Sequence, residues 1–199
     1  VSLDRSHNWS MHPLGHELSA YYDLTHGITL AIVMPRWLKY IKDDRLGKNI
    51  SKIGLGAARF GTNLSEKEAF QLLDIFSSCG GTLIDTARSY SPWKPDSRGN
   101  SEKCIGKWME INNKRGKMVL VTKGGIRGEH GEIIDASKTN LINELDESLE
   151  ALRTNYIDIY LLHKDDTERT VEEIIETMQF IKEKAKATRI GIANMEYNR

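Results

Sequence analysis

Apolar and polar residues follow two alternating patterns from residue 50 onward. Short runs rich in β-branched and other apolar residues are separated by longer amphipathic stretches, the order typical of βα units that build a parallel sheet. The pattern predicts five such units. Their expected strands are residues 52–60, 82–86, 118–123, 157–163 and 189–194.

The amphipathic stretches predict helices that pack on this sheet. Ser65 and Glu68 have the spacing of a capping box, which marks the start of a helix. Three apolar stripes at helical spacing give the helices one face for the sheet. They are Ala69, Leu72, Leu73 and Phe76; Leu141, Leu145, Leu149 and Leu152; and Val171, Ile174, Ile175, Met178 and Ile181.

The number of units limits the fold class. A closed (β/α)8 barrel, or TIM barrel, takes about 250 residues, so the chain after residue 49 holds only about five of its eight units. We therefore expect an α/β fold, either an open sheet or a partial TIM (β/α)8 barrel with about five βα units. Residues 1–49 lack the alternation and predict a short helical segment, so we place a boundary in the polar stretch 43–51, between segments 1–49 and 50–199.

Composition narrows the range of partners. Lys plus Arg and Asp plus Glu each number 28 and the basic residues form no long run, so we expect no nucleic-acid and no membrane partner. Cys79 and Cys104 match neither a metal knuckle nor a disulfide framework, which favours a reduced, cytoplasmic protein. The apolar run 28–34 is too short to span a bilayer.

Polar side chains end three of the predicted strands. They are Asp85, Lys123 and His163, and Tyr90 follows Asp85 in the next loop. Because the carboxyl ends of parallel strands lie on one face, we expect the four to converge. Taken singly, each has an ordinary structural role as a turn cap, a solvated cation or a hydrogen-bonded ring.

Together the four side chains suit the reduction of a carbonyl group. This reaction needs a proton donor, and a tyrosine is too weak an acid unless a nearby ammonium lowers its pKa. Lys123 would have that effect on Tyr90, and Asp85 would hold Lys123 in place. His163 would orient the carbonyl.

Five segments in order carry a family resemblance: ISKIGLGAARFG, IDTARSY, LVTKGG, LDESLEALRTNYIDIYLLHKDD and GIANM. They resemble the aldo-keto reductases, NADP-dependent carbonyl reductases built on an eight-stranded βα barrel. The resemblance implies that Tyr90 is the general acid, assisted by Lys123 and Asp85. It also implies that His163 fixes a small aldehyde or ketone for hydride transfer from NADPH.

The same resemblance indicates where the cofactor would lie. Asp85, the backbone at Gly56 and Ala57, and Asn194 match positions that line the nicotinamide end of NADP.

Two departures from the family pattern accompany this resemblance. Residues 183–194 lack the glycine that the family usually has before its fifth strand and are one residue longer, so the sequence leaves the geometry of this turn open. The chain also stops at Arg199, before the family's last three strands. We therefore expect open sheet edges, self-association through them, and weak binding of NADPH.

A histidine-rich stretch lies near the start of the chain, with His12, His16 and His26 inside MHPLGHELSAYYDLTHGI. Two imidazoles make an incomplete site, because zinc takes three or four ligands and iron takes more, and surface histidines are the simpler interpretation. The surrounding segment WSMHPLGHELSAYYDLTHGITLAIVMPRWLKYI resembles the carboxy-terminal domain of iron-containing alcohol dehydrogenases of the butanol dehydrogenase type. There His12 and His26 match metal ligands, but the remaining ligands would precede Val1, so we predict no metal site.

Two loop segments carry weaker signals. Residues 91–103 predict a loop over the catalytic face, in which Trp93 either lines a substrate pocket or is simply exposed. Gly124 and Gly125 predict a turn rather than a phosphate site, because no glycine-rich phosphate motif surrounds them.

These observations leave three hypotheses. The first is an NADP-dependent oxidoreductase of the aldo-keto reductase type. The second is an inactive, truncated or chimeric fragment that joins pieces of two oxidoreductases by gene fusion. The third is a scaffold that becomes active only when two half-barrels pair.

Overall fold

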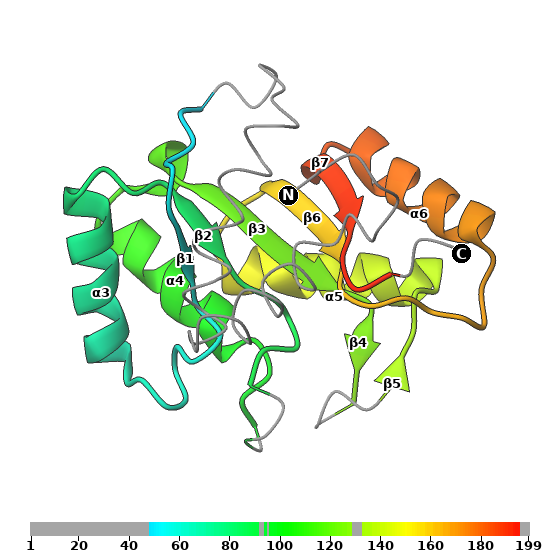
Figure 1. Ribbon diagram of the computed structural model, residues 1–199, viewed down its shortest axis with the longest axis horizontal. Coiled ribbons are helices and arrows are strands. Elements are labelled where there is room, and N and C mark those ends of the chain that lie inside the picture. The colour runs from blue at the N-terminus through cyan, green and yellow to red at the C-terminus, as the bar shows by residue number, and fades with distance from the viewer. Residues whose placement is uncertain (1–47, 92–93, 95, 129–132, 196–199) are drawn as a thin grey trace, which may run out of the picture.

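A parallel sheet of five strands forms the centre of the structure, a computed structural model that describes residues 48–91, 94, 96–128 and 133–195 (Figure 1). Each neighbouring pair of strands in it is parallel. The predicted α/β fold, a partial TIM barrel with five βα strands, is thereby confirmed. The spatial order is β1 (Gly54–Gly56), β2 (Leu83–Asp85), β3 (Val119–Gly124), β6 (Ile157–Leu162) and β7 (Ala187–Ile192).

The first strand is shorter than the sequence pattern predicts. β1 ends at Gly56, and the N–H of Phe60 donates to the carbonyl of Ala57 at 3.1 Å, which closes a turn. Gly61 then has φ 68°, a left-handed conformation that glycine adopts without steric cost. The predicted strand 52–60 is therefore wrong beyond Gly56, because apolar residues in this turn extend the run without extending the strand.

Both faces of the sheet are buried. Ile84, Leu120 and Tyr160 belong to a large apolar cluster that the sheet shares with the helices. Their strand neighbours Leu83 and Val119 belong to a second cluster on the opposite face. This alternation is expected of strands with a two-residue period, and burial of both faces explains why the strands read as continuous apolar runs.

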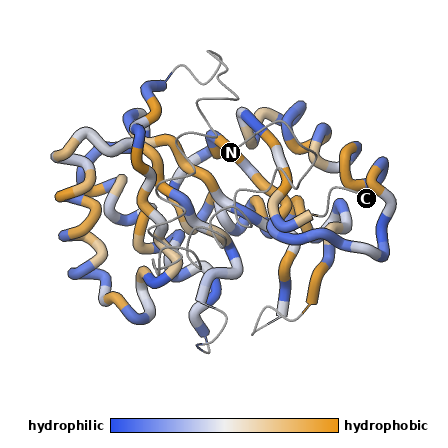
Figure 2. The backbone as a smooth tube through the Cα atoms, in the orientation of Figure 1, coloured by the Kyte–Doolittle hydropathy of each residue, from blue (hydrophilic) through white to orange (hydrophobic). Residues whose placement is uncertain are grey.

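Four helices connect the strands and cover one face of the sheet. Figure 1 shows α3 beside β1, α5 behind the sheet and α6 beside β7, and successive helices also contact one another. In Figure 2 the strands at the centre are mostly coloured as hydrophobic, whereas hydrophobic and hydrophilic residues alternate along the helices. The helices are α3 (Glu66–Ser78), α4 (Asn100–Ile111), α5 (Lys138–Ala151) and α6 (Val171–Glu183), with a short 3-10 turn η2 at Arg115–Lys117.

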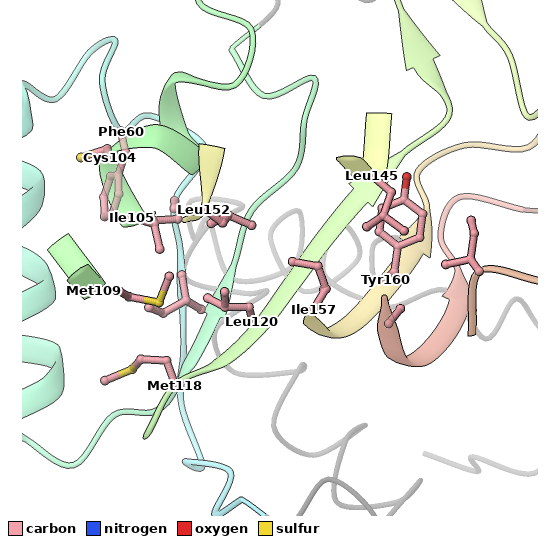
Figure 3. Packing of buried hydrophobic residues seen from close by; sticks show 14 of the residues in the cluster. Phe60, Cys104, Ile105, Met109, Met118, Leu120, Leu145, Leu152, Ile157 and Tyr160 are labelled. Atoms are coloured by element: carbon pink, nitrogen blue, oxygen red, sulfur yellow. The ribbon is translucent and has the colours of Figure 1, made fainter. Parts of the chain in front are cut away.

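The helix stripes pack as the sequence predicts, except at Leu72 and Ile175, which are exposed. Leu141 and Leu145 of α5 are fully buried, and Figure 3 shows Leu145 against the ring of Tyr160. In α6, Ile181 is buried, whereas Ile175 is 48% exposed and lies at the margin of the stripe.

The predicted capping box starts α3. The Ser65 side chain accepts from the N–H of Glu68, and the Glu68 carboxylate accepts from the N–H of Ser65 at 2.8 Å. A second box, between Thr170 and Glu173, starts α6 in the same way, although we did not predict it.

Two other segments differ from prediction. The loop expected over residues 91–103 ends earlier, because α4 begins at Asn100 directly after Gly99, whose φ is 75°. A small antiparallel pair, β4 (Ile126–Arg127) and β5 (Ile133–Ile134), was not predicted, since two residues are too few to show a strand period.

The structure defines the turn before β7, whose geometry the missing glycine had left open. α6 ends at Glu183, and Ala185 then adopts φ 55°, a left-handed conformation that disfavours a side chain.

The predicted boundary near residue 49 lies at the margin of the described residues, and the helical segment 1–49 lies almost wholly outside them. Within the part of the chain that the structure describes, no helix has the length and apolar character needed to cross a membrane.

Candidate active site

The polar strand ends meet at one edge of the sheet. Asp85 is the last residue of β2, Lys123 lies one residue before the end of β3, and His163 follows β6 directly. By the two-residue alternation of their strands, the three share the face of the second apolar cluster, away from the helices. The loop after β2 brings Tyr90 to the same place.

Lys123 is the centre of the site. Its side chain is 0% exposed, and its Nζ donates to Asp85 Oδ1 at 2.6 Å, to the carbonyl of Thr86 at 2.8 Å and to Tyr90 Oη at 2.8 Å. An ammonium has three N–H donors, and here three acceptors use them. A neutral amine has only two N–H donors, so this set of partners fits the charged form of Lys123.

Tyr90 is held between opposite charges. Its hydroxyl accepts from Lys123 and donates to Asp85 Oδ2 at 2.7 Å. Burial raises the pKa of Tyr90 well above its usual value, and the Asp85 carboxylate raises it further. Burial also lowers the pKa of Lys123, against the opposing effect of Asp85. Burial and the carboxylate thus give the Tyr90 pKa its upward direction, and the lowering effect expected of Lys123 stays a prediction.

His163 stands across from Tyr90. The two rings meet edge to face, with 5.9 Å between their centroids. The Nδ1 of His163 lies 3.0 Å from Ser89 Oγ. Its backbone is also fixed, since its N–H donates to the carbonyl of Gly124 and its carbonyl accepts from Asn194 Nδ2 at 2.7 Å.

The loop that carries Tyr90 is fastened to the strands and to α4. The N–H of Arg88 donates to the carbonyl of Lys123 at 3.0 Å. The Arg88 guanidinium lies 3.3 Å from a carboxylate oxygen of Glu102, which is fully buried in α4. The other oxygen of Glu102 accepts from Thr122 Oγ1 at 2.6 Å, and burial raises the pKa of Glu102. These bonds explain why the loop holds one conformation beside Lys123.

Sequence reasoning missed Ser89 and Glu102. Ser89 had a visible signal, because it is a polar residue directly before Tyr90 in a loop already expected at the site. Glu102 had none, since a glutamate in an amphipathic helix is normally exposed and its burial depends on Arg88 and Thr122, which are distant in sequence.

The positions expected to hold the cofactor lie at the same edge. Gly56 ends β1 beside Asp85, and a Cβ added to it would meet no atom within 4 Å. The N–H of Ala57 donates to the carbonyl of Asp85 at 2.9 Å. Asn194 follows β7 with φ 54°. An open backbone next to the buried polar groups of Asp85 and Lys123 fits a planar ring such as nicotinamide.

No cluster of three or more His, Cys, Asp or Glu side chains suited to a metal ion occurs among residues 48–91, 94, 96–128 and 133–195. His12, His16, His26 and Trp93 all lie outside the described residues. Gly125 has φ 94°, in agreement with the turn predicted after β3.

Comparison with known proteins assigns this site to a family. Residues 52–199 match the sequence model of the Aldo/keto reductase family. The chain belongs to the aldo/keto reductase family. The aryl-alcohol dehydrogenase [NADP(+)] of Phanerodontia chrysosporium is 34% identical over 166 residues, which cover 74% of this chain and 42% of that protein. The solved aldo-keto reductase from Bacillus halodurans, in its holo form, superposes with a TM-score of 0.64 at 30% identity over 73% of this chain and 47% of that one.

The start of this aldo/keto reductase chain has a different relative. Residues 1–74 match the model of the Fe-containing alcohol dehydrogenase family, C-terminal. The NADH-dependent butanol dehydrogenase A of Clostridium acetobutylicum is 56% identical over 52 residues, 26% of this chain and 13% of that protein. The resemblance seen in the sequence is confirmed for both segments. The chain spans less than half the length of these relatives.

Proposed function

We propose that this chain carries the proton-donating site of an NADP-dependent carbonyl reductase that acts on aldehydes or ketones. The observation that carries the proposal is the buried Lys123 ammonium, bonded at once to Asp85 and to the hydroxyl of Tyr90. A cation in this position has a chemical use, because it stabilises negative charge on the tyrosine oxygen.

Tyr90 is assigned the role of general acid. The phenol is protonated at neutral pH, so a proton is present for transfer. Because burial and Asp85 raise the pKa of Tyr90, release of this proton depends on Lys123, which would stabilise the phenolate. As the carbonyl carbon accepts a hydride, negative charge develops on the carbonyl oxygen, and the phenol O–H bond breaks as a new O–H bond forms there. Lys123 then donates to the resulting phenolate at the 2.8 Å separation already present. The product is an alcohol.

His163 is assigned the orientation of the substrate. Its ring lies edge-on to Tyr90, so a carbonyl oxygen beside both rings would accept from His163 and, once the Tyr90 hydroxyl turns away from Asp85, from Tyr90 as well. Fixed donors around that oxygen stabilise the developing charge without reorganising during the reaction.

The cofactor proposed is NADP, which when bound would supply the hydride. Gly56, Asp85 and Asn194 would hold the nicotinamide end of it. Support for NADP comes from the name of the Phanerodontia chrysosporium relative, and support for a nicotinamide comes from the family as a whole.

A second candidate is an inactive chimera of two oxidoreductases. The specific observation in its favour is that two family models match this one chain and overlap at residues 52–74. In that overlap the structure has β1, which is a strand of the reductase sheet, and the first part of α3, the helix that follows it.

Oxidation of NADPH in the presence of a panel of aldehydes and ketones separates the two candidates. We expect turnover by the chain and a loss of about 100-fold or more in Tyr90→Phe, which removes the proton but keeps the ring. A fluorescence titration with NADPH should give equal affinities for the two proteins. Absence of turnover despite NADPH binding would favour the inactive chimera, and equal turnover in both proteins would exclude Tyr90 as the acid.

We further propose a reducing compartment such as the cytoplasm. Cys79 and Cys104 are both free thiols, one exposed and one buried.

A further inference from the structure

Ser89 is a nearly buried hydroxyl inside the site to which the proposed reaction assigns no role. Only 8% of Ser89 is exposed, and its Oγ is 3.0 Å from Nδ1 of His163. It directly precedes Tyr90, so a single loop would supply both the acid and a partner for the histidine ring.

The loop holds Ser89 firmly in this position. On one side the N–H of Arg88 donates to the carbonyl of Lys123, and on the other the N–H of Tyr90 donates to the carbonyl of Ala87. The backbone of His163 is bonded to Gly124 in β3. The distance between Ser89 and His163 is therefore set by the sheet and its loops.

A neutral imidazole has one nitrogen that donates and one that accepts, and the hydrogen bond at either nitrogen selects between the two tautomers. A hydroxyl that donates to Nδ1 makes Nδ1 the acceptor and leaves the ring proton on Nε2. If Nδ1 carried the proton, Nε2 would be an acceptor and would repel a carbonyl oxygen. Only the first arrangement gives His163 a donor for a carbonyl substrate.

We propose that Ser89 is a positioning residue: its hydroxyl donates to Nδ1 of His163 and keeps the ring proton on Nε2, the nitrogen that would donate to the substrate carbonyl. This assignment rests on the proposed function, because the need for a donor to the carbonyl selects between the two tautomers that the 3.0 Å contact allows.

The tautomer can be measured without any activity. In protein labelled with nitrogen-15 histidine, long-range proton–nitrogen correlation spectra distinguish a protonated from an unprotonated ring nitrogen. Spectra would be recorded at a pH where the ring is neutral, with His163→Asn to assign the signals among the six histidines. We expect an unprotonated Nδ1 and a protonated Nε2.

Two variants test the role of Ser89. In Ser89→Ala we expect the two nitrogen shifts to move toward each other, as both tautomers become populated. Ser89→Thr keeps the hydroxyl and should retain the wild-type pattern. A protonated Nδ1 in the wild type, or a wild-type pattern in Ser89→Ala, would overturn the proposal. Backbone amide spectra of each variant show whether the sheet is intact.

A kinetic comparison then tests the use of the proton. If the chain reduces carbonyls, Ser89→Ala should lose about tenfold in kcat/KM, roughly the effect of one misdirected hydrogen bond. Ser89→Thr should lose little, and affinity for NADPH should not change. A tautomer shift with unchanged kcat/KM would show that Ser89 determines the tautomer. It would overturn the proposal that the Nε2 proton of His163 donates to the substrate carbonyl.

Discussion

Lys123 is buried without exposed surface, yet it keeps a complete set of hydrogen-bond acceptors. Two of the three are side chains that sequence reasoning had already connected with it, Asp85 and Tyr90. The third is the carbonyl of Thr86, which no residue pattern indicates. At this scale the structure adds that burial and the Asp85 carboxylate raise the pKa of Tyr90.

Replacing Asp85 with asparagine tests whether its carboxylate raises the pKa of Tyr90. The change removes the carboxylate charge that raises the pKa of Tyr90, so in Asp85→Asn we expect Tyr90 to ionise at a lower pH than in the wild type. Absorbance of the tyrosinate during an alkaline titration measures it, after the titration of Tyr90→Phe is subtracted to remove the other tyrosines. An unchanged or higher pKa in Asp85→Asn would show that the carboxylate does not control Tyr90.

At the scale of single elements, α6 departs from the preference for glycine directly after the end of a helix. The helix has a capping box at its start, but its end passes through Ala185 in a left-handed conformation where helices favour glycine. Sequence comparison with the family already indicated that a glycine was missing from this segment. The structure locates the strained residue and its φ angle of 55°.

Glycine at this position should stabilise the protein. The left-handed conformation costs a residue with a Cβ about 1–2 kcal/mol, which exceeds the extra unfolded-chain entropy of glycine. We therefore expect Ala185→Gly to raise the free energy of unfolding by about 0.5–1 kcal/mol, measured by urea denaturation. The matched control is Lys184→Gly at the preceding residue, whose φ is −74° and where glycine should destabilise. Equal effects of the two changes would contradict this explanation.

At the scale of the whole molecule, one buried carboxylate joins distant parts of the chain. Asp158 in β6 accepts from Lys48 Nζ at 2.7 Å, pairs with Arg115 at 2.9 Å and accepts from the N–H of Leu120 at 2.9 Å. Asp158 is 1% exposed, and this cluster lies at the end of the sheet opposite the candidate active site. It connects Lys48, which precedes β1, to β3 and β6.

Loss of the Asp158 carboxylate should lower the free energy of unfolding far more than loss of a surface carboxylate. Asp158→Ala leaves the N–H of Leu120 without its acceptor and removes the carboxylate partner of Lys48 and Arg115, so we expect a decrease of about 3 kcal/mol in the free energy of unfolding. Asp146→Ala, which removes an exposed partner of Lys186, should cost about 0.5 kcal/mol or less. Urea denaturation of both variants measures the difference. Similar values would show that the cluster at Asp158 does not support the fold.

The sequence by itself determined the parallel α/β fold, the start of α3 and the four residues that meet at the strand ends. It could do so because strand and helix periods and capping are local, and because parallel strands always present their carboxyl ends together. The end of β1, the pair β4–β5 and the left-handed Ala185 were decided by turns that the apolar pattern does not encode.

Only the tertiary structure decided how the site is supported. Ser89 against His163 and Thr122 against Glu102 bring together residues 74 and 20 positions apart. Their side chains are ordinary in sequence and become significant only through burial, where a polar group needs a partner. The same burial explains the pKa of Tyr90, since the cost of removing charge from water depends on surroundings that fold only as a whole.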